Sequence, residues 1–113
     1  MKKNIRLAII LLSIGIIFSE CKKDEDKNDT PGTNEVFIQS MAFNPSTITI
    51  APNTTVTWTN KESTTHTVTS NNLLFSSGNL GKDSKFTFTF DSAGTYNYHC
   101  SIHPSMTAKV IVQ

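Results

Sequence analysis

Four side chains that bind soft or borderline metal ions stand in two short stretches of this chain. The stretch "YHCSIHPSM" contains Cys100, His103 and Met106, each three positions from the next, and His66 lies upstream in "STTHTVTS". A thiolate, two imidazoles and a weak thioether form the ligand set of a mononuclear copper centre, with two His and one Cys in a plane and Met on the axis. Zinc also accepts thiolate and imidazole, but a thioether contributes little to zinc binding, so the set favours copper.

Each of these residues alone has an ordinary structural explanation. A lone buried Cys or Met is common core filling, and a lone core His is more often simply hydrogen-bonded. The copper prediction therefore depends on all four meeting. Pro104 removes an amide donor and favours a turn, which lets the three loop side chains curl around one point. The third histidine, His99, falls on the opposite strand face from Cys100 and is expected at the surface.

The remaining sequence after residue 34 alternates apolar and polar residues, which predicts half-buried antiparallel strands. "KFTFTF" directs Phe86, Phe88 and Phe90 inward, and "TYNYHC" directs Tyr98 and Cys100 to the core. Turn signals separate the runs. The prediction is an all-β protein, a Greek-key β-sandwich or small barrel of seven to eight strands. The expected strands are residues 36–43, 47–50, 55–59, 66–70, a weak one at 73–75, 85–90, 95–100 and 108–113.

The N-terminal part of the chain is predicted to direct export. Lys2, Lys3 and Arg6 precede an apolar run at residues 7–18, which is shorter than the roughly 20 residues of a membrane span. This pattern is typical of a secretory signal, so we assign residues 1–20 to a signal peptide rather than to a buried helix.

Residues 21–34 are expected to form a flexible tether, because the stretch contains no large apolar residue. Cys21 resembles the lipid-attachment cysteine of bacterial lipoproteins, although Glu20 and Phe18 stand where that pattern prefers a small residue and Leu. The expectation is a protein of the cell envelope, periplasmic or on the outer surface, anchored by lipid on Cys21. An ordinary cleaved signal followed by a free thiol is the alternative.

The predicted domain, residues 35–113, is nearly neutral, which argues against nucleic-acid binding. It has four lysines and four acidic residues: Lys61, Lys82, Lys85, Lys109, Glu35, Glu62, Asp83 and Asp91. Neither a Ser-His-acid arrangement nor a carboxylate pair stands out, and one spare histidine is too few for further copper ions. The chain is therefore not expected to be an enzyme.

Residues 35–113 resemble the cupredoxins of the plastocyanin, pseudoazurin and amicyanin group. The resemblance lies in "FNPSTITIAPNTTVTWTN", "HTVTS", "FDSAGTYNYHCSIHPSM" and "VIV". It implies that His66, Cys100, His103 and Met106 hold one copper ion. Thr67 stands where many members have an Asn that braces the ligand loop, and its hydroxyl could do a similar job; Ala108 stands where many have Gly.

The resemblance also implies one-electron transfer between exported redox partners such as cytochromes. We expect a monomer that docks weakly and transiently through an apolar patch around His103 that includes Leu73, Leu74 and Phe75. The main alternative is a copper-binding protein for storage, delivery or tolerance without electron transfer. A metal-free adhesive sandwich is the third possibility.

Overall fold

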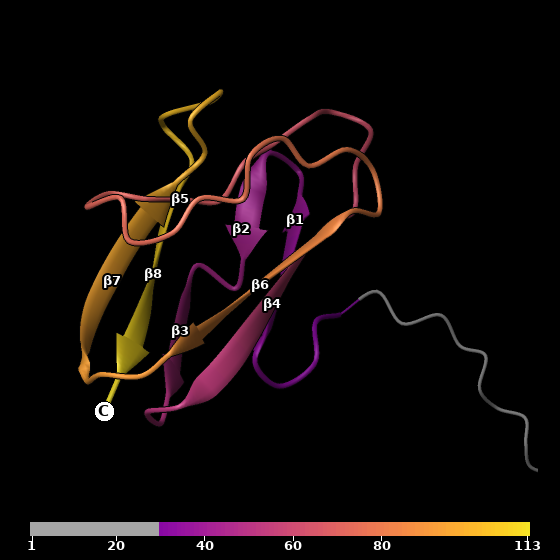
Figure 1. The fold of residues 1–113 in the computed structure, drawn as a ribbon. Coiled ribbons are helices and arrows are strands. Elements are labelled where there is room, and N and C mark those ends of the chain that lie inside the picture. The colour runs from indigo at the N-terminus through magenta and orange to yellow at the C-terminus, as the bar shows by residue number, and fades with distance from the viewer. Residues whose placement is uncertain (1–29) are drawn as a thin grey trace, which may run out of the picture.

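The computed structural model describes residues 30–113, which form two packed β-sheets. The strands are β1 Glu35–Gln39, β2 Ala42–Asn44, β3 Thr47–Ile50, β4 Thr54–Asn60, β5 Thr69–Ser70, β6 Lys85–Phe90, β7 Gly94–His99 and β8 Thr107–Val112. One sheet has the order β2-β1-β4-β6 and the other β3-β8-β7-β5 (Figure 1). The all-β prediction is confirmed. Residues 1–29, with the predicted signal, Cys21 and most of the tether, lie outside the described part.

The sheets are mixed, whereas the alternation of the sequence suggested antiparallel strands throughout. β1 pairs in parallel with β4, and β3 pairs in parallel with β8, while the other pairs are antiparallel. Period-two alternation reports which face of a strand is buried and carries no information on the direction of its neighbour. The parallel pairs arise because the chain crosses between the sheets after β2 and again after β3.

Three expected strands differ in the structure. Residues 36–43 form two strands, because the chain turns at Ser40 and Met41, whose φ angles are 56° and 57°. The run 66–70 shortens to β5, although His66 still forms an isolated bridge with Leu80. Residues 73–75 form no strand: the Ser70 amide donates to the Phe75 carbonyl at 2.9 Å, which closes a turn.

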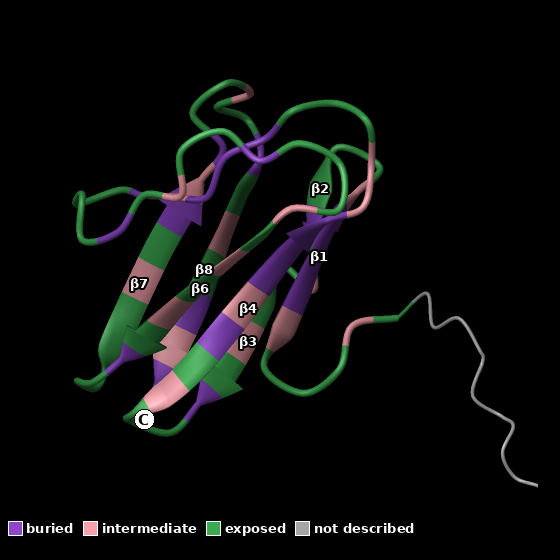
Figure 2. Ribbon diagram, turned by 45° about the vertical axis from the view of Figure 1, so that its right-hand side comes forward, coloured by how far each residue is buried: buried purple, intermediate pink, exposed green. Residues whose placement is uncertain are grey.

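The core lies between the sheets and is rich in aromatic rings. Trp58 is fully buried, with ring centroids 5.5 Å from Tyr98, 5.6 Å from Phe86 and 5.9 Å from Phe75. Figure 2 shows buried segments along β1 and β4 and exposed loops around both ends. Burial of this apolar surface drives the packing of the two sheets. No helix that could cross a membrane is found among residues 30–113.

Candidate metal centre

The four candidate ligands lie in loops at one end of the sandwich. Cys100 directly follows β7, and His103 and Met106 stand in the loop that leads to β8. His66 lies in the connection between β4 and β5. Figure 1 shows the loop between β7 and β8 at the end where β4 and β7 finish and β1 turns into β2, opposite the end marked C. We call this the ligand end.

Three of the four side chains meet in a tight cluster. Cys100 Sγ lies 3.7 Å from His66 Nδ1 and 3.6 Å from His103 Nδ1. One ligand atom from each of these residues lies within 4.8 Å of the others. His66 and Cys100 are fully buried, whereas His103 is partly exposed. Residues from two distant segments thus converge, as predicted from the sequence.

Backbone hydrogen bonds hold the loop that carries Cys100, His103 and Met106. The Cys100 amide donates to the Met106 carbonyl at 3.0 Å, and the Met106 amide donates to the His103 carbonyl at 2.9 Å. These bonds fold the segment back on itself, so that the backbone of Met106 lies beside that of Cys100. The Met106 side chain is buried. The three-residue spacing therefore forms a closed turn that can present all three side chains to one point.

The surroundings of Cys100 favour its thiolate form. The Thr67 amide donates to Sγ at 3.3 Å. Burial raises the pKa of the Cys100 thiol, but hydrogen bonds from the Thr67 amide and from the His66 and His103 rings outweigh burial and lower that pKa to about 6. The thiolate is the form that binds metals, so the protein prepares this sulfur as a ligand.

Glu62 orients the His66 ring, a role that the sequence analysis missed. Glu62 Oε1 lies 2.6 Å from His66 Nε2. The carboxylate accepts this hydrogen bond from Nε2, so it fixes the ring with Nδ1 facing Cys100. Partial burial raises the pKa of Glu62, but hydrogen bonds from His66 and from the Met41 and Ser40 amides lower it overall. An acidic residue four positions before His66 was the available signal.

The Thr67 hydroxyl braces the ligand loop, as the sequence analysis suggested it could. Its Oγ1 accepts a hydrogen bond from the Ser101 amide at 2.8 Å and lies 3.0 Å from Ser101 Oγ. Thr69 Oγ1 lies 2.9 Å away on the other side. Three hydroxyls therefore link the segment after His66 to the segment after Cys100.

The structure separates the other candidates from this cluster. His99 is partly exposed, and its Nδ1 lies 2.6 Å from Asn71 Oδ1. It therefore lies outside the group, as expected. Leu73 and Leu74 are exposed, but Phe75 is only 5% exposed. The inclusion of Phe75 in a surface patch was wrong, because its ring packs against Phe88 with centroids 4.8 Å apart.

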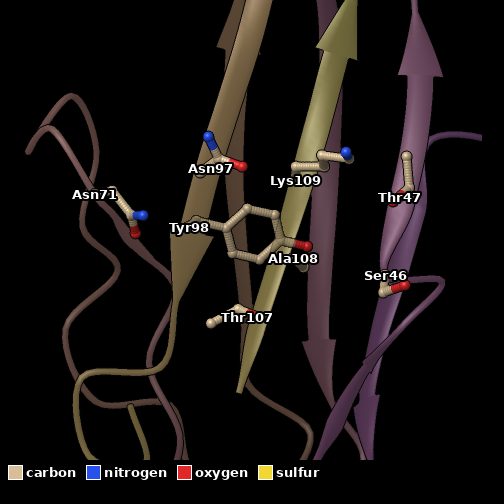
Figure 3. Close-up of a pocket in the computed structure, with 8 residues that line it drawn as sticks. All are labelled: Ser46, Thr47, Asn71, Asn97, Tyr98, Thr107, Ala108 and Lys109. Carbon is tan, nitrogen blue, oxygen red and sulfur yellow. The ribbon is translucent and has the colours of Figure 1, made fainter. Parts of the chain in front are cut away.

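A shallow polar groove of about 350 Å³ lies on the outer face of the β3-β8-β7 sheet. Figure 3 shows its lining, which includes Asn71, Asn97, Thr107 and Lys109. None of the four candidate ligands lines this groove. The cluster of His66, Cys100 and His103 is therefore a compact site for an ion, separate from this groove.

The donor set fits copper. A thiolate and two imidazole nitrogens gathered around one point, with a thioether residue closing the same loop, suit an ion that accepts soft ligands. The burial of His66 and Cys100 excludes bulk water from most of the site. The fixed orientation of His66 through Glu62 is the outer support that metal-binding histidines usually have.

Comparisons with known proteins agree with this geometry. The family profile described as "Cupredoxin-like domain" matches residues 8–112. This chain belongs to the cupredoxin-like family. Among curated proteins, this cupredoxin is 35% identical over 92 residues to amicyanin of Paracoccus denitrificans, covering 73% of this chain and 66% of that protein. It is 33% identical over 87 residues to chloroplastic plastocyanin of Tetradesmus obliquus, covering 66% of this chain and 60% of the relative.

Solved structures show the same likeness. A Cu(I) form of an amicyanin variant matches with a TM-score of 0.67 and 32% identity, covering 70% of this cupredoxin and 80% of that chain. A purple cupredoxin from Nitrosopumilus maritimus matches with a TM-score of 0.66 and 31% identity, covering 70% of this chain and 98% of that one. The chain thus spans less than two thirds of some curated relatives but nearly all of this structural neighbour.

Proposed function

We propose that this cupredoxin is a type 1 blue copper protein that carries single electrons between exported redox proteins. The proposed ligands are His66, Cys100, His103 and Met106. The observation that carries the proposal is the cluster of one thiol and two imidazoles within 4.8 Å, built from two distant segments. A copper ion bound there would supply the one-electron couple between its monovalent and divalent states.

The protein's own residues would keep the site similar in both oxidation states. The closed turn of residues 100–106, the Glu62 contact to His66 and the Thr67 hydroxyl each fix one part of the ligand set. A set of ligands that moves little has a low reorganisation cost, which favours rapid electron transfer. The burial of three of the four proposed ligands, His66, Cys100 and Met106, argues against the alternative of copper storage or delivery, which needs ligands that exchange readily.

His103 is the proposed point of electron exit, because it is the partly exposed member of the cluster. The apolar surface proposed for docking includes Ile102, beside His103, and Met41, on the turn that contacts Glu62; each is 46% exposed. Leu73 and Leu74 add apolar surface on the flank near His99. A surface made of a few exposed apolar side chains suits weak and transient docking of a partner such as a cytochrome.

Export and lipid anchoring are proposed from the N-terminal pattern. A signal at residues 1–20 and a lipid on Cys21 would leave residues 22–34 as the link between an envelope membrane and the copper domain. The expected result is that the full chain partitions into detergent after Triton phase separation and that Cys21→Ser moves it to the aqueous phase. Aqueous partitioning of the unaltered chain would contradict the anchor and leave the copper proposal untouched.

The decisive experiment is an absorption spectrum of the purified protein after addition of cupric ion. We expect an intense band at about 600 nm, from charge transfer between thiolate and copper. Cys100→Ser should abolish the band, whereas the matched control His99→Gln should keep it because His99 lies outside the cluster. Stopped-flow reduction by a small cytochrome then separates an electron carrier from a copper store: slow exchange in a fully blue protein would contradict the carrier function.

A further inference from the structure

Lysines are unevenly distributed over the described domain. Lys61 directly follows β4, Lys85 begins β6, and Lys82 lies just before it, so three lysines stand at the ligand end. We call Lys61, Lys82 and Lys85 the basic rim. Figure 1 shows the end of β4 and the start of β6 side by side at this end of the sandwich. Lys109 lies in β8 on the outer face of the other sheet.

Neutral groups hold the three ammonium groups of the basic rim. Lys61 Nζ lies 4.8 Å from the centroid of the Phe37 ring, and Lys82 Nζ donates to the Lys61 carbonyl at 3.1 Å. Lys85 Nζ donates to Thr59 Oγ1 at 3.0 Å. Within residues 30–113, no carboxylate pairs with these lysines, and Glu62 is instead hydrogen-bonded to His66. Their positive charge is therefore oriented but not neutralised by this part of the chain.

Nearby acidic groups offset this charge only in part. Glu62 is engaged by His66 and by the Met41 amide, which leaves exposed Asp83 as the other carboxylate close to the rim. Asp91 follows β6 at the opposite end of the sandwich. A charge asymmetry along the molecule orients it in the field of an approaching partner and raises the rate of productive encounter.

We propose that the basic rim, together with the exposed side chains of Met41 and of Ile102 in the loop of His103, is a docking surface for a redox protein whose own docking face is acidic. This inference rests on the proposed electron-carrier function and adds the charge of the partner. Interfaces of this kind combine an apolar centre with a polar rim. Here the centre lies around His103, and the rim occupies the side where β4 ends and β6 begins. The charge of the basic rim raises the rate of encounter, and the apolar centre is the surface that the partner buries in the complex.

The first experiment maps anion binding without copper. The ¹⁵N-labelled metal-free full chain is titrated with hexacyanochromate(III), a paramagnetic trianion that stands in for an acidic face. Amide signals near Lys61, Lys82 and Lys85 should broaden first. The triple variant with all three lysines changed to Gln should lose this broadening, while the matched control Lys109→Gln keeps it. Broadening centred on Lys109, or spread evenly over the domain, overturns the proposal.

The second experiment measures electron transfer from the reduced, copper-loaded chain to hexacyanoferrate(III). The triple Gln variant should react roughly three- to tenfold more slowly at low salt, and the Lys109→Gln control should match the unaltered protein. The difference should shrink at about 0.3 M salt, because charges farther apart than a Debye length of about 6 Å are then largely screened. The cationic oxidant tris(phenanthroline)cobalt(III) should react as fast with the variant or faster.

The two proposals fail in different ways. A chain that never becomes blue contradicts the copper function, although the anion map can still stand. A chain that is blue and transfers electrons, but whose rates with the anionic oxidant are unchanged in the triple variant, keeps the copper function and contradicts the basic rim.

Discussion

The Thr67 hydroxyl joins the two segments that carry the candidate ligands. It accepts from the Ser101 amide and lies beside the hydroxyls of Ser101 and Thr69, while the Thr67 amide donates to Cys100 Sγ. One residue therefore contacts the sulfur through its backbone and the ligand loop through its side chain. This arrangement suits a residue that is 3% exposed, because both its amide and its hydroxyl have hydrogen-bond partners.

Thr67→Val should lower the free energy of unfolding by about 1 kcal/mol, because the Ser101 amide loses its acceptor. The absorption band should remain, since the Thr67 amide still reaches Sγ. Urea unfolding measures the change. Thr67→Ser should restore most of the stability, and Thr87→Val, an exposed β6 position, is the matched control. An equal loss in the control variant would show that the hydroxyl bridge has no special role.

The Cys100 thiol gives the metal-free protein a predictable pH dependence. Its pKa in the folded chain is lowered to about 6, so between that value and the ordinary thiol range the unfolded chain binds more protons than the folded one. The free energy of unfolding should therefore rise with pH above about 6, and this contribution should be lost as pH falls through about 6.

Absorbance of the thiolate at about 240 nm, followed in a Cys21→Ser background, measures the titration of Cys100 itself. Urea unfolding across the same pH range measures the stability, with Cys100→Ser as the control that should be flatter. A titration midpoint near the ordinary thiol value would contradict the role of the Thr67, His66 and His103 hydrogen bonds.

At the scale of elements, the turn of the β1–β2 hairpin supports the site through Glu62. Its two-residue turn, Ser40 and Met41, joins Gln39 to Ala42, and the Met41 amide donates to Glu62, which in turn holds His66. Both turn residues have positive φ, as in a type I′ turn, which favours Asn and Gly over Ser and Met. The hairpin thus has a turn sequence that is unfavourable for its backbone angles, but the Met41 amide in that turn helps to hold Glu62.

Replacing the turn by Asn-Gly, as Ser40→Asn with Met41→Gly, should raise the free energy of unfolding by about 1 kcal/mol, because the strained φ angles become favourable. The amide contact to Glu62 survives, so the copper spectrum should not change. Thermal unfolding followed by circular dichroism gives the stability. A less stable variant would mean that the Met41 side chain contributes more than its backbone strain costs.

At the scale of the whole molecule, the two sheets are held together by a large apolar core. Trp58, Tyr98 and Phe90 fill it, and His66, Cys100 and His103 cluster at the ligand end. The packed pair of sheets therefore holds, at one end, the loops that carry the candidate ligands. We expect the core to suffice for folding and metal binding to add to the stability of the folded chain.

The metal-free domain should keep its β-sheet circular dichroism, and cupric ion should raise the melting temperature, because copper binds the folded state alone. At a hundredfold excess over the dissociation constant the gain is about 2.7 kcal/mol. Cys100→Ser should melt near the metal-free protein and show little further gain. An unfolded metal-free chain would contradict the view that the core alone determines the fold.

The sequence supplied much of the fold, because alternation marks which side chains face the core. Val56, Trp58 and Phe90 are buried as expected. It did not reveal the turn at Ser40, since neither Ser nor Met signals a positive φ, nor the parallel pairing of β1 with β4. Phe75 was expected in an apolar surface patch with Leu73 and Leu74, whereas its long-range contact with Phe88 helps to bury it.

By itself, the sequence determined the kinds of donor atoms and the three-residue spacing that brings Cys100, His103 and Met106 into one turn, because both are local properties. Only the tertiary structure decided that His66 reaches the same point and that Glu62 and Thr67 hold it there. It also gathers three lysines at the ligand end. The pairing of β4 with β6 brings the lysines together, and the crossing of the chain from β4 to β5, which pairs with β7, brings His66 to the loop after β7. No local pattern encodes either relation, because each depends on strands that are far apart in the sequence.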